Sequence, residues 1–432
     1  MKRYALDILK TWKNSKARKP MIIRGARQVG KTWLMKEFGK TCFSKTAYIN
    51  FDANERMRSV FAGSLDIPRL LQALNAETGI DIQPADTLLI FDEVQEVPRA
   101  LASLKYFNEN APEYAVVAAG SLLGIALHEG TSFPVGKVDF MDLYPLNFRE
   151  FLEACGENRF AAMLVQDDTD MINSFREKYT DRLKQYLFTG GMPEAVETFI
   201  TTRDYGQVRA IQKNILLYYE QDFSKHAPLR EVPRLTMIWH SIPAELAREN
   251  RKFIYGLIRH GARAAEYETA LLWLSDCGLV HKVNRIKKPD IPLIAYTDIS
   301  AFKLYLNDVG LLAAMGDIDA RVIIDGSAIF EEFKGALTEQ YVLQQLISDC
   351  GIKPYYYSSE KSDGEIDFIL QKENRIIPIE VKAAENLQAK SLKSYHLKYH
   401  PECSVRTSLS PFRTDDWLTN IPLYAVCRIS RL

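Results

Sequence analysis

Residues 25–32 have the types and the spacing of a phosphate-binding loop. They read Gly-Ala-Arg-Gln-Val-Gly-Lys-Thr, which fits the pattern Gly-x-x-x-x-Gly-Lys-[Ser/Thr]. Gly25 and Gly30 allow the φ angles and the close backbone approach that a polyphosphate needs. Lys31 can reach the β- and γ-phosphates, and the hydroxyl of Thr32 can ligate Mg²⁺. The pattern predicts a site for ATP and Mg²⁺ formed by Gly25, Ala26, Arg27, Gln28, Val29, Gly30, Lys31, Thr32 and Trp33.

Two acids follow a continuous apolar run at residues 88–91. Such a run is typical of a strand in a parallel sheet, where both faces are buried. The acids then emerge at the carboxyl end of the strand, where α/β folds bind ligands. We predict that Asp92 holds Mg²⁺ and that Glu93 activates the water that attacks the γ-phosphate.

A second group of acids lies between residues 367 and 382, in the pattern Asp…Glu-x-Lys. Asp367 and Glu380 stand in successive predicted strands, so they can share a Mg²⁺ ion. Lys382 follows Glu380 by two residues and points to the same face of its strand. It could there stabilise or deprotonate a water that attacks a phosphodiester. Glu339, in the preceding predicted helix, is the candidate to complete this metal site.

The elements around the loop follow from the apolar pattern. A strand at 21–23 leads into the loop, and a helix at 32–38 leaves it, so backbone N–H groups and the helix dipole converge on one point. Further strands are expected at 47–52, 87–92 and 115–121, with helices at 1–13, 65–77 and 100–109.

The middle of the chain is expected to be helical. Residues 160–199 form helices broken at Gly190-Gly191-Met192-Pro193, and a further helix covers 208–225. Three helices at 235–241, 253–260 and 263–277, with strands at 279–286 and 302–306, suggest a winged helix. The first of these is expected to stop before Pro243.

The third helix of this group would be the recognition helix of a DNA-binding winged helix. It carries Glu266 and Glu268 among apolar residues, which favours packing over contact with phosphates. Arg285, Lys287 and Lys288 form the local basic cluster in the wing. A structural or regulatory winged helix is favoured, and direct DNA reading stays open.

Several motifs resemble those of a prokaryotic group of predicted AAA+ superfamily ATPases that carry a C-terminal domain of unknown function. They are the loop at 25–32, Phe-Asp-Glu-Val-Gln at 91–95, Leu-Tyr-Pro-Leu-Asn-Phe-Arg-Glu-Phe-Leu at 143–152 and Gly-Gly-Met-Pro-Glu at 190–194. The resemblance implies a P-loop fold with a strand inserted between the strands of Lys31 and Asp92. It implies Ser121 as a catalytic sensor of the γ-phosphate, with an ordinary strand-end serine as the alternative.

The same resemblance bears on coupling and assembly. Gly-x-Pro at 191–193 is similar to a motif that couples a following domain to bound nucleotide, and it also fits a helix-ending turn. Such ATPases often complete their site with an arginine from a neighbouring copy. Arg99 and Arg149 are candidates here, and a homo-oligomer is one option that the sequence leaves open.

The C-terminal part resembles restriction-endonuclease-like nucleases of the PD-(D/E)XK type. A helix at 329–348, strands at 354–358, 365–370 and 375–382, and a helix at 386–399 give the order α-β-β-β-α. The expected fold class is α/β. Residues 1–158 form an AAA-type P-loop core, 159–225 a helical lid, 226–316 the winged helix and 317–432 the nuclease-like domain.

Composition narrows the alternatives. The chain has 432 residues, 47% of them hydrophobic, and its 55 basic and 55 acidic residues cancel. Bulk attraction to nucleic acid or membrane is therefore not indicated. The six cysteines stand singly, no apolar run reaches membrane-spanning length, and the first residues do not read as a signal peptide. The simplest expectation is a cytoplasmic protein.

Three functions remain open at this point. The first is an ATPase coupled to a metal-dependent nuclease that acts on DNA. The second is an ATP-dependent switch whose C-terminal fold binds nucleic acid or protein without cutting. The third, weaker one is a structural assembly protein in which ATP only orders the lid. Asp367, Glu380 and Lys382 favour the first, whereas the acidic recognition helix and zero net charge favour the second.

Overall fold

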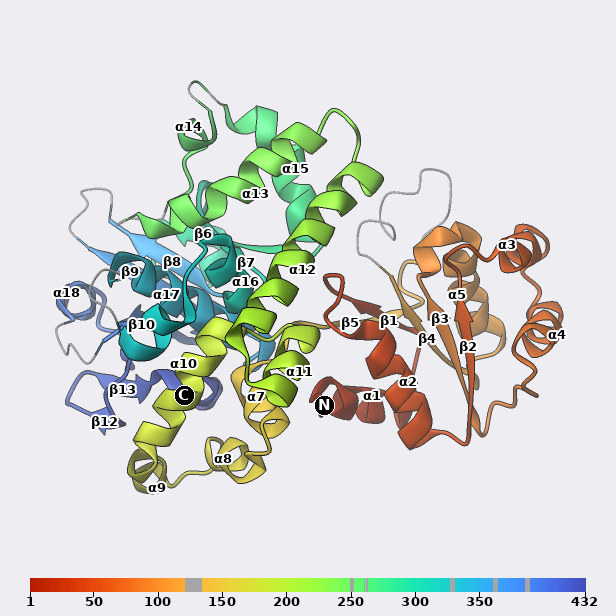
Figure 1. The fold of residues 1–432 in the computed structure, drawn as a ribbon, viewed down its shortest axis with the longest axis horizontal. Helices are drawn as coiled ribbons and strands as arrows, with labels where there is room; N and C mark the ends of the chain where they lie inside the picture. Colours follow the sequence, from red (N-terminus) through yellow and green to blue (C-terminus); the bar gives the residue numbers. More distant parts are fainter. Residues whose placement is uncertain are drawn as a thin grey trace. The chain divides into compact units, whose positions relative to one another are not determined.

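The computed structural model describes residues 1–120, 134–248, 252–259, 261, 263–326, 331–359, 364–384 and 389–432. The chain divides into two compact units, which are treated separately (Figure 1). The N-terminal unit comprises Lys2–Tyr144 and Asp276–Gly278, and the C-terminal unit comprises Pro145–Ser275 and Leu279–Leu432. The division at Tyr144 precedes the expected end of the first domain at 158.

The N-terminal unit is built on a parallel five-stranded sheet with the order β2-β3-β4-β1-β5. Its strands are β1 (Met21–Arg24), β2 (Lys45–Asn50), β3 (Thr87–Asp92), β4 (Ala115–Ala119) and β5 (Asp139–Asp142). Strand β4 pairs with both β1 and β3, so the expected inserted strand is confirmed. Every residue of β3 is buried, as its continuous apolar run predicts.

Helices α1 (Ala5–Lys13), α2 (Lys31–Cys42), α3 (Glu55–Ala62), α4 (Ile67–Thr78) and α5 (Pro98–Asn110) complete this unit, with a short 3₁₀ turn η1 (Val94–Glu96). Phenylalanines hold β3 to its neighbours. The ring centroid of Phe91 lies 5.4 Å from that of Phe51 and 6.0 Å from that of Phe61, and both pairs pack edge to face. These aromatic contacts fix the carboxyl end of β3 from one side.

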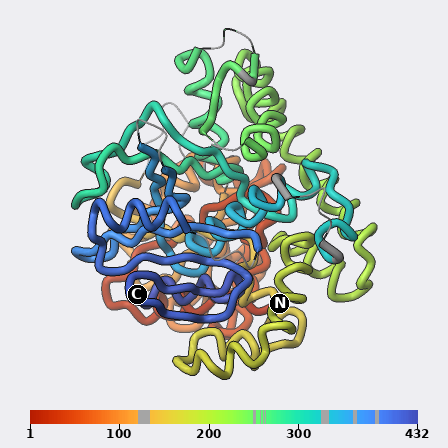
Figure 2. Tube along the Cα trace, turned by 90° about the vertical axis from the view of Figure 1, so that its left-hand side faces the viewer, coloured from red at the N-terminus to blue at the C-terminus, as the bar shows by residue number. Residues whose placement is uncertain are grey.

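The C-terminal unit contains a mixed eight-stranded sheet with the order β12-β13-β11-β10-β9-β8-β6-β7. Figure 2 shows the strands of its C-terminal part side by side in blue. The strands are β6 (Val280–Ile286), β7 (Thr297–Leu306), β8 (Tyr355–Ser358), β9 (Glu365–Lys372), β10 (Arg375–Val381), β11 (Val405–Ser408), β12 (Arg413–Thr414) and β13 (Thr419–Pro422).

The helices of this unit lie before, between and after those strands. They are α7 (Phe148–Ala154), α8 (Asn158–Met163), α9 (Thr169–Ser174), α10 (Arg176–Thr189), α11 (Pro193–Thr202), α12 (Tyr205–His226), α13 (Val232–Ala247), α14 (Tyr255–Ile258), α15 (Ala264–Asp276), α16 (Val309–Met315), α17 (Glu331–Ser348) and α18 (Lys390–Tyr399), with η2 (Leu293–Tyr296), η3 (Val322–Gly326) and η5 (Leu423–Arg431). In the described ranges, no helix combines the length and apolar character needed to cross a membrane.

The expected winged helix is not confirmed as a separate domain. Its helices and its two strands follow in the expected order, but β6 also pairs with β8, placing Arg285 opposite Tyr356 and Ile286 opposite Tyr357. The two strands are therefore one end of the larger sheet, which continues across the expected boundary at 316. The expected order helix, three strands, helix is present as α17-β8-β9-β10-α18, but an endonuclease fold is not confirmed by it.

Helix α13 continues through Pro243, so the expectation that it stops before this residue is wrong. A proline inside a helix costs roughly 3 kcal/mol, mainly through the lost hydrogen bond and a steric clash. Trp239, Ile242 and Leu246 are fully buried around it. Burial of these three side chains outweighs the local cost, since each contributes roughly 1.5–3 kcal/mol.

The turn at Gly190-Gly191 is enclosed by backbone from two other segments. A Cβ on Gly191 would lie 2.0 Å from the carbonyl oxygen of Leu146, and one on Gly310 would lie 2.6 Å from Gly190 N. Asp308, which is fully buried, accepts a hydrogen bond of 2.6 Å from Gly191 N. The Gly-x-Pro motif thus lies in a tightly packed junction inside the C-terminal unit. Neither Gly191 nor Gly310 has space there for a side chain.

Candidate functional site

The predicted phosphate-binding loop joins β1 to α2 in the N-terminal unit. Gly25 has a φ of 146° and Gly30 has a φ of 95°, both outside the range that other residues favour. A Cβ on Gly25 would lie 2.2 Å from the carbonyl oxygen of Leu143. Helix α2 begins at Lys31, so its first N–H groups face the loop, as the sequence predicts.

Lys31 is buried and turned into the loop. Its Nζ donates to the carbonyl oxygens of Gly25 at 2.9 Å and Ala26 at 2.8 Å. Burial lowers the pKa of the Lys31 ammonium to about 8, although the nearby carboxylates of Glu93 and Asp92 oppose this shift. The ammonium is thus positioned at the centre of the loop, where the phosphates of a nucleotide would meet it.

Asp92 receives hydrogen bonds from two other elements. Thr32 Oγ1 donates to Asp92 Oδ2 at 2.7 Å, and the Tyr48 hydroxyl donates to the same oxygen at 3.0 Å. Asp92 Oδ1 accepts from Glu93 N at 3.1 Å. The loop and the end of β3 are therefore brought together. A hydroxyl and a carboxylate at hydrogen-bond distance are a donor set that fits Mg²⁺.

Tyr48 was not among the residues that the sequence singled out. It lies on β2, paired in register with Ile90 of β3, and its hydroxyl reaches Asp92 from the neighbouring strand. Burial, and then the negative charge of Asp92, raise the pKa of the Tyr48 hydroxyl, so it remains a donor. Its place two residues before the end of a parallel strand was a signal that the sequence did contain.

Glu93 occupies a constrained position directly after β3. Its φ is 51°, in the left-handed region that a non-glycine residue adopts at a local energy cost. Its Oε2 accepts a hydrogen bond of 2.6 Å from Gln95 Nε2. The charge of this carboxylate acts on Lys31, where it opposes the lowering of the ammonium pKa. Gln95, 6% exposed, was quoted in the sequence motif but given no role there.

The sequence also suggested a sensor serine and two candidate arginines for the nucleotide site. Ser121 lies outside the described residues. Arg99 donates to the carbonyl oxygens of Phe61 and Gly63, each at 2.7 Å. Arg149 forms an ion pair of 3.0 Å with Asp349 inside the C-terminal unit. Both arginines therefore have structural partners within their own unit.

Asp367, Glu380 and Lys382 come together at the carboxyl end of β10. Asp367 Oδ2 accepts from Val381 N at 2.8 Å, and Lys382 Nζ lies 2.7 Å from Glu380 Oε1. Glu380 is 4% exposed, and within the described ranges its Oε2 has no hydrogen-bond partner. Burial raises the pKa of the Glu380 carboxyl, Lys382 opposes the rise, and Asp367 adds to it.

This arrangement of the second site fits a divalent cation. Two neighbouring carboxylates repel each other, and Lys382 supplies a single positive charge for the pair. Oxygen ligands of this kind suit Mg²⁺ or Mn²⁺. The two carboxylates and the lysine therefore lie close together, and their role in metal binding stays a prediction.

Glu339, which was expected to complete the second metal site, contacts other side chains instead. It is buried on α17, accepts from the Tyr305 hydroxyl at 3.0 Å, and lies 3.6 Å from Lys303 Nζ. Lys303, itself fully buried, also pairs with Glu365 at 2.5 Å. Among the residues that the structure describes, no three His, Cys, Asp or Glu side chains are grouped so as to hold a metal ion. The geometry thus gives Glu339 an ion pair in the core.

Three family models match the chain. Residues 17–152 match the model of an AAA domain. Residues 180–322 and 334–426 match two domains of unknown function, DUF8612 and DUF4143 respectively. The AAA match contains both the loop and Asp92-Glu93, so it agrees with the α/β P-loop architecture of the N-terminal unit. No curated protein matches the sequence.

Several solved structures are similar to this chain at low sequence identity. The Walker-type ATPase PABY2304 of Pyrococcus abyssi is 14% identical, with a TM-score of 0.46, covering 73% of this chain and 95% of that one. Aeropyrum pernix Orc1 in complex with DNA is 13% identical and has a TM-score of 0.27, and the match covers 73% of this chain and 91% of that one. AMPPCP-bound DnaA from Aquifex aeolicus is 13% identical and has a TM-score of 0.28, and the match covers 63% of this chain and 88% of that one. These likenesses carry no argument about activity.

Proposed function

We propose that this protein binds ATP with Mg²⁺ at residues 25–33 and hydrolyses it. The observation that carries the proposal is the junction of Thr32 with Asp92, beside a buried Lys31 and within a matched AAA domain. In this proposal Lys31 holds the β- and γ-phosphates by charge. Thr32 and Asp92 hold the metal, which would neutralise charge on the phosphates during transfer.

Glu93 is proposed as the general base. A base must reach the proton of the attacking water, which calls for a carboxylate beside the γ-phosphate position. The hydrogen bond from Gln95 holds that carboxylate in one orientation. Binding of nucleotide would also return full charge to Lys31, since the phosphates stabilise its protonated form.

The test of the ATPase proposal is phosphate release at saturating ATP and Mg²⁺. The Lys31→Ala variant should lose tight ATP binding and turnover, measured with a fluorescent ATP analogue and a phosphate sensor. Lys40→Ala is the matched control, because Lys40 is an exposed lysine at the last turn of the same helix. Equal ATP affinity in folded Lys31→Ala and wild-type protein would reject the loop as the nucleotide site.

The C-terminal unit is proposed to act on DNA through Asp367, Glu380 and Lys382. Glu380 Oε2, which has no hydrogen-bond partner among the described residues, and the neighbouring Asp367 support a metal-dependent phosphodiester hydrolase. The alternative is an ATP-dependent switch whose C-terminal unit binds without cutting. The engagement of Glu339 by Lys303 favours this alternative, because it leaves two carboxylates for the metal.

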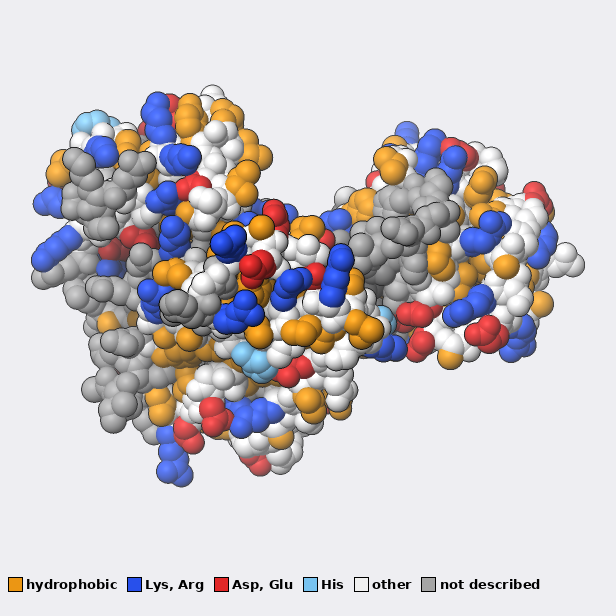
Figure 3. All heavy atoms as spheres, turned by 90° about the horizontal axis from the view of Figure 1, so that it is seen from above, with side chains coloured by type: hydrophobic (Ala, Val, Ile, Leu, Met, Phe, Trp, Pro, Cys, Tyr) orange, Lys and Arg blue, Asp and Glu red, His pale blue; other side chains and the backbone are white. Residues whose placement is uncertain are grey.

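A surface view bears on the choice between these two. The face in Figure 3 carries basic and acidic side chains interspersed with apolar ones, in keeping with the equal numbers of both signs. DNA binding would therefore depend on local contacts and not on bulk charge. The salt dependence of DNA affinity, with and without ATP, measures how many phosphates are contacted.

A further inference from the structure

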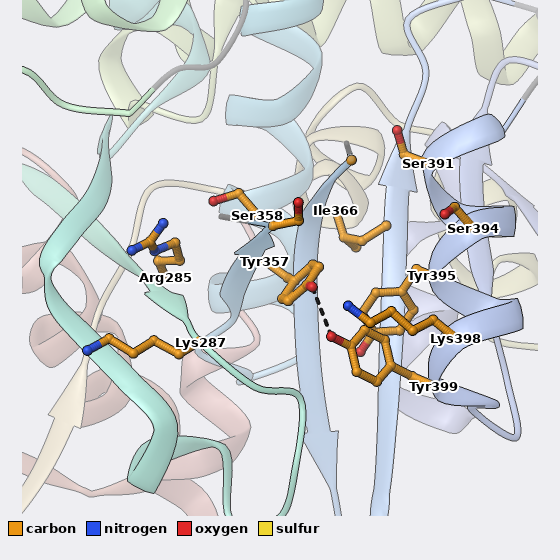
Figure 4. A pocket seen from close by; sticks show the side chains of 12 residues that line it. Arg285, Lys287, Tyr357, Ser358, Ile366, Ser391, Ser394, Tyr395, Lys398 and Tyr399 are labelled. Atoms are coloured by element: carbon orange, nitrogen blue, oxygen red, sulfur yellow. Dashed lines mark hydrogen bonds between the residues drawn. The ribbon is translucent and has the colours of Figure 1, made fainter. Parts of the chain in front are cut away.

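A pocket of about 610 Å³ lies in the C-terminal unit between β6, β8 and α18. Figure 4 shows Arg285 and Lys287 on the β6 side and Lys398 on the α18 side, with Tyr357 between them. The described residues that line the pocket include three cations and no acid. Its size is typical of a small-molecule site, which usually measures roughly 300–1,000 Å³. The pocket is distinct from the residues assigned above to either metal.

The cations of the pocket are held in different ways. Asp298 accepts from Arg285 Nε at 3.2 Å and Nη2 at 2.5 Å, which fixes the guanidinium. No described residue accepts a hydrogen bond from its Nη1. Lys287 is exposed, and none of the described acidic residues forms an ion pair with it. The pocket therefore presents one oriented guanidinium and the ammonium groups of Lys287 and Lys398, which together favour an anion.

Three tyrosines of the pocket form a compact aromatic wall. The Tyr357 and Tyr399 hydroxyls are hydrogen-bonded at 2.9 Å, and the rings of Tyr395 and Tyr399 are 4.8 Å apart. Figure 4 shows Lys398 reaching from α18 toward the hydroxyls of Tyr357 and Tyr399. A hydrogen bond to Tyr399 raises the pKa of the Lys398 ammonium, so it is charged at neutral pH.

Tyr395 supplies an independent sign that a ligand belongs here. It is 4% exposed, and its hydroxyl has no hydrogen-bond partner among the described residues. A buried, unpartnered hydroxyl costs roughly 1–3 kcal/mol unless something satisfies it. It lies among the lining residues together with the hydroxyls of Ser391 and Ser394. Hydroxyl groups and cations that surround one cavity can donate hydrogen bonds to the oxygens of a phosphate group.

We propose that this pocket binds a phosphate-bearing small molecule of the size of a nucleoside monophosphate. In this proposal Lys398 would hold the phosphate from the α18 side, and a planar ring would stack on the tyrosine wall, with the guanidinium of Arg285 across the pocket. The proposal concerns a second ligand site, separate from the loop at residues 25–33. It does not depend on hydrolysis of ATP or on cutting of DNA.

The experiment uses the full-length protein carrying Lys31→Ala, which removes the loop from the measurement. 5′-AMP, adenosine and inorganic phosphate are titrated by calorimetry. We expect 5′-AMP to bind at least tenfold more tightly than adenosine. Lys398→Ala should weaken 5′-AMP about tenfold, because it removes a charged hydrogen-bond donor. Lys393→Ala is the matched control, since Lys393 is exposed on the same helix but does not line the pocket.

Tyr395→Phe separates a ligand role from a structural one. Removing an unpartnered buried hydroxyl should leave the melting temperature unchanged or raised, while 5′-AMP affinity falls roughly fivefold. Equal affinities for adenosine and 5′-AMP would overturn the proposal, as would unchanged 5′-AMP binding in both Lys398→Ala and Tyr395→Phe. Binding of a single-stranded oligonucleotide at this pocket, with no binding of 5′-AMP, would also overturn it in favour of a strand site.

Discussion

Thr32 and Asp92 are joined by a hydrogen bond of 2.7 Å between Oγ1 and Oδ2, although 60 residues of chain separate them. The pair depends on the sheet order, which places β4 between β1 and β3 and aligns the carboxyl ends of all three. The loop alone could bind phosphate, and the acid alone could end a strand. Their contact brings the two motifs together at the place where we propose that Mg²⁺ binds.

Asp92→Asn tests this contact directly. The amide keeps the shape but supplies no charge to a metal, so Mg²⁺-dependent turnover should fall roughly 10²–10³-fold. Tyr48→Phe removes one donor to Asp92 and leaves the carboxylate, so its turnover should change only a few-fold. Phosphate release over a range of Mg²⁺ concentrations is the measurement. Full turnover by Asp92→Asn at low Mg²⁺ would place the metal elsewhere.

The pKa of Lys31 makes ATP affinity depend on pH. Burial lowers that pKa to about 8 in the free protein, so the ammonium loses its proton as pH rises through this value. Phosphates favour the charged form, so binding at pH 8 should take up roughly half a proton. Affinity should therefore fall between pH 7 and 9. Calorimetry in buffers of different ionisation enthalpy measures the uptake, and constant affinity across this range would contradict the assignment.

Glu93→Gln should separate binding from turnover. The variant keeps the size and the place of the side chain but loses the base, so ATP should bind normally while hydrolysis falls roughly 10²–10⁴-fold. Gln95→Ala removes the donor that orients Glu93, and a smaller loss is expected because the base itself remains. Binding and single-turnover hydrolysis are measured on the same preparations. Normal hydrolysis by Glu93→Gln would assign the base to another residue.

The sequence predicts those parts of both sites whose geometry depends on a few neighbouring residues in the chain. The loop, the run before Asp92 and the spacing of Glu380 and Lys382 are short patterns whose geometry follows from a turn or a single strand. The structure places these residues together as the patterns indicate. Strands β1 to β4 were also predicted closely, because buried parallel strands carry continuous apolar runs, whereas β5 was not predicted.

What the sequence did not predict depends on contacts between distant segments. Tyr48 reaches Asp92 only through the register of β2 on β3. Glu339 pairs with Lys303 because α17 packs near β7, and no local pattern encodes that partner. The continuity of β6 with β8 likewise depends on strand pairing across separate stretches of chain. Pairing of this kind is a property of the tertiary fold and leaves no spacing in the sequence.

Asp308 should be a strong determinant of the stability of the C-terminal unit. It accepts hydrogen bonds from Gly191 N at 2.6 Å, Leu311 N at 3.1 Å and Gln344 Nε2 at 3.1 Å. Asp308→Ala leaves the N–H groups of Gly191 and Leu311 without this acceptor, while Gln344 Nε2 keeps its bond to the Tyr186 hydroxyl. We expect a loss of about 3 kcal/mol. Asp317→Ala is the control, since Asp317 is mostly exposed and pairs only at the surface.

Urea unfolding followed by circular dichroism measures both Asp308 and Asp317 variants. Because the chain has two units, the transitions should be separated with a second probe before free energies are compared. Equal midpoints for Asp308→Ala and wild type would show that the junction at Gly190-Gly191 contributes little. A lowered midpoint for Asp317→Ala of the same size would show a general effect of lost charge.

The second metal site is tested first by metal binding. Protons compete with Mn²⁺ for the carboxylates, and the pKa of Glu380 is raised by burial. Mn²⁺ affinity should therefore increase with pH through that raised value, and this dependence should disappear in Glu380→Gln. Calorimetric titration at several pH values measures it. Mn²⁺ binding that is independent of both pH and Glu380 would remove the site from consideration.

Cleavage is the second and separate test of that site. Wild-type protein is incubated with supercoiled plasmid and linear DNA, with Mg²⁺ or Mn²⁺, in the presence and absence of ATP. We expect metal-dependent nicking that is lost in Asp367→Ala and reduced roughly 10²-fold in Lys382→Ala, because the lysine serves the attacking water. Lys390→Ala is the control, as an exposed lysine at the start of α18. Intact DNA in every condition, with metal still bound at Glu380, would favour the switch that binds without cutting. Equal cleavage by the variants and the wild type would mean that the activity does not come from these residues.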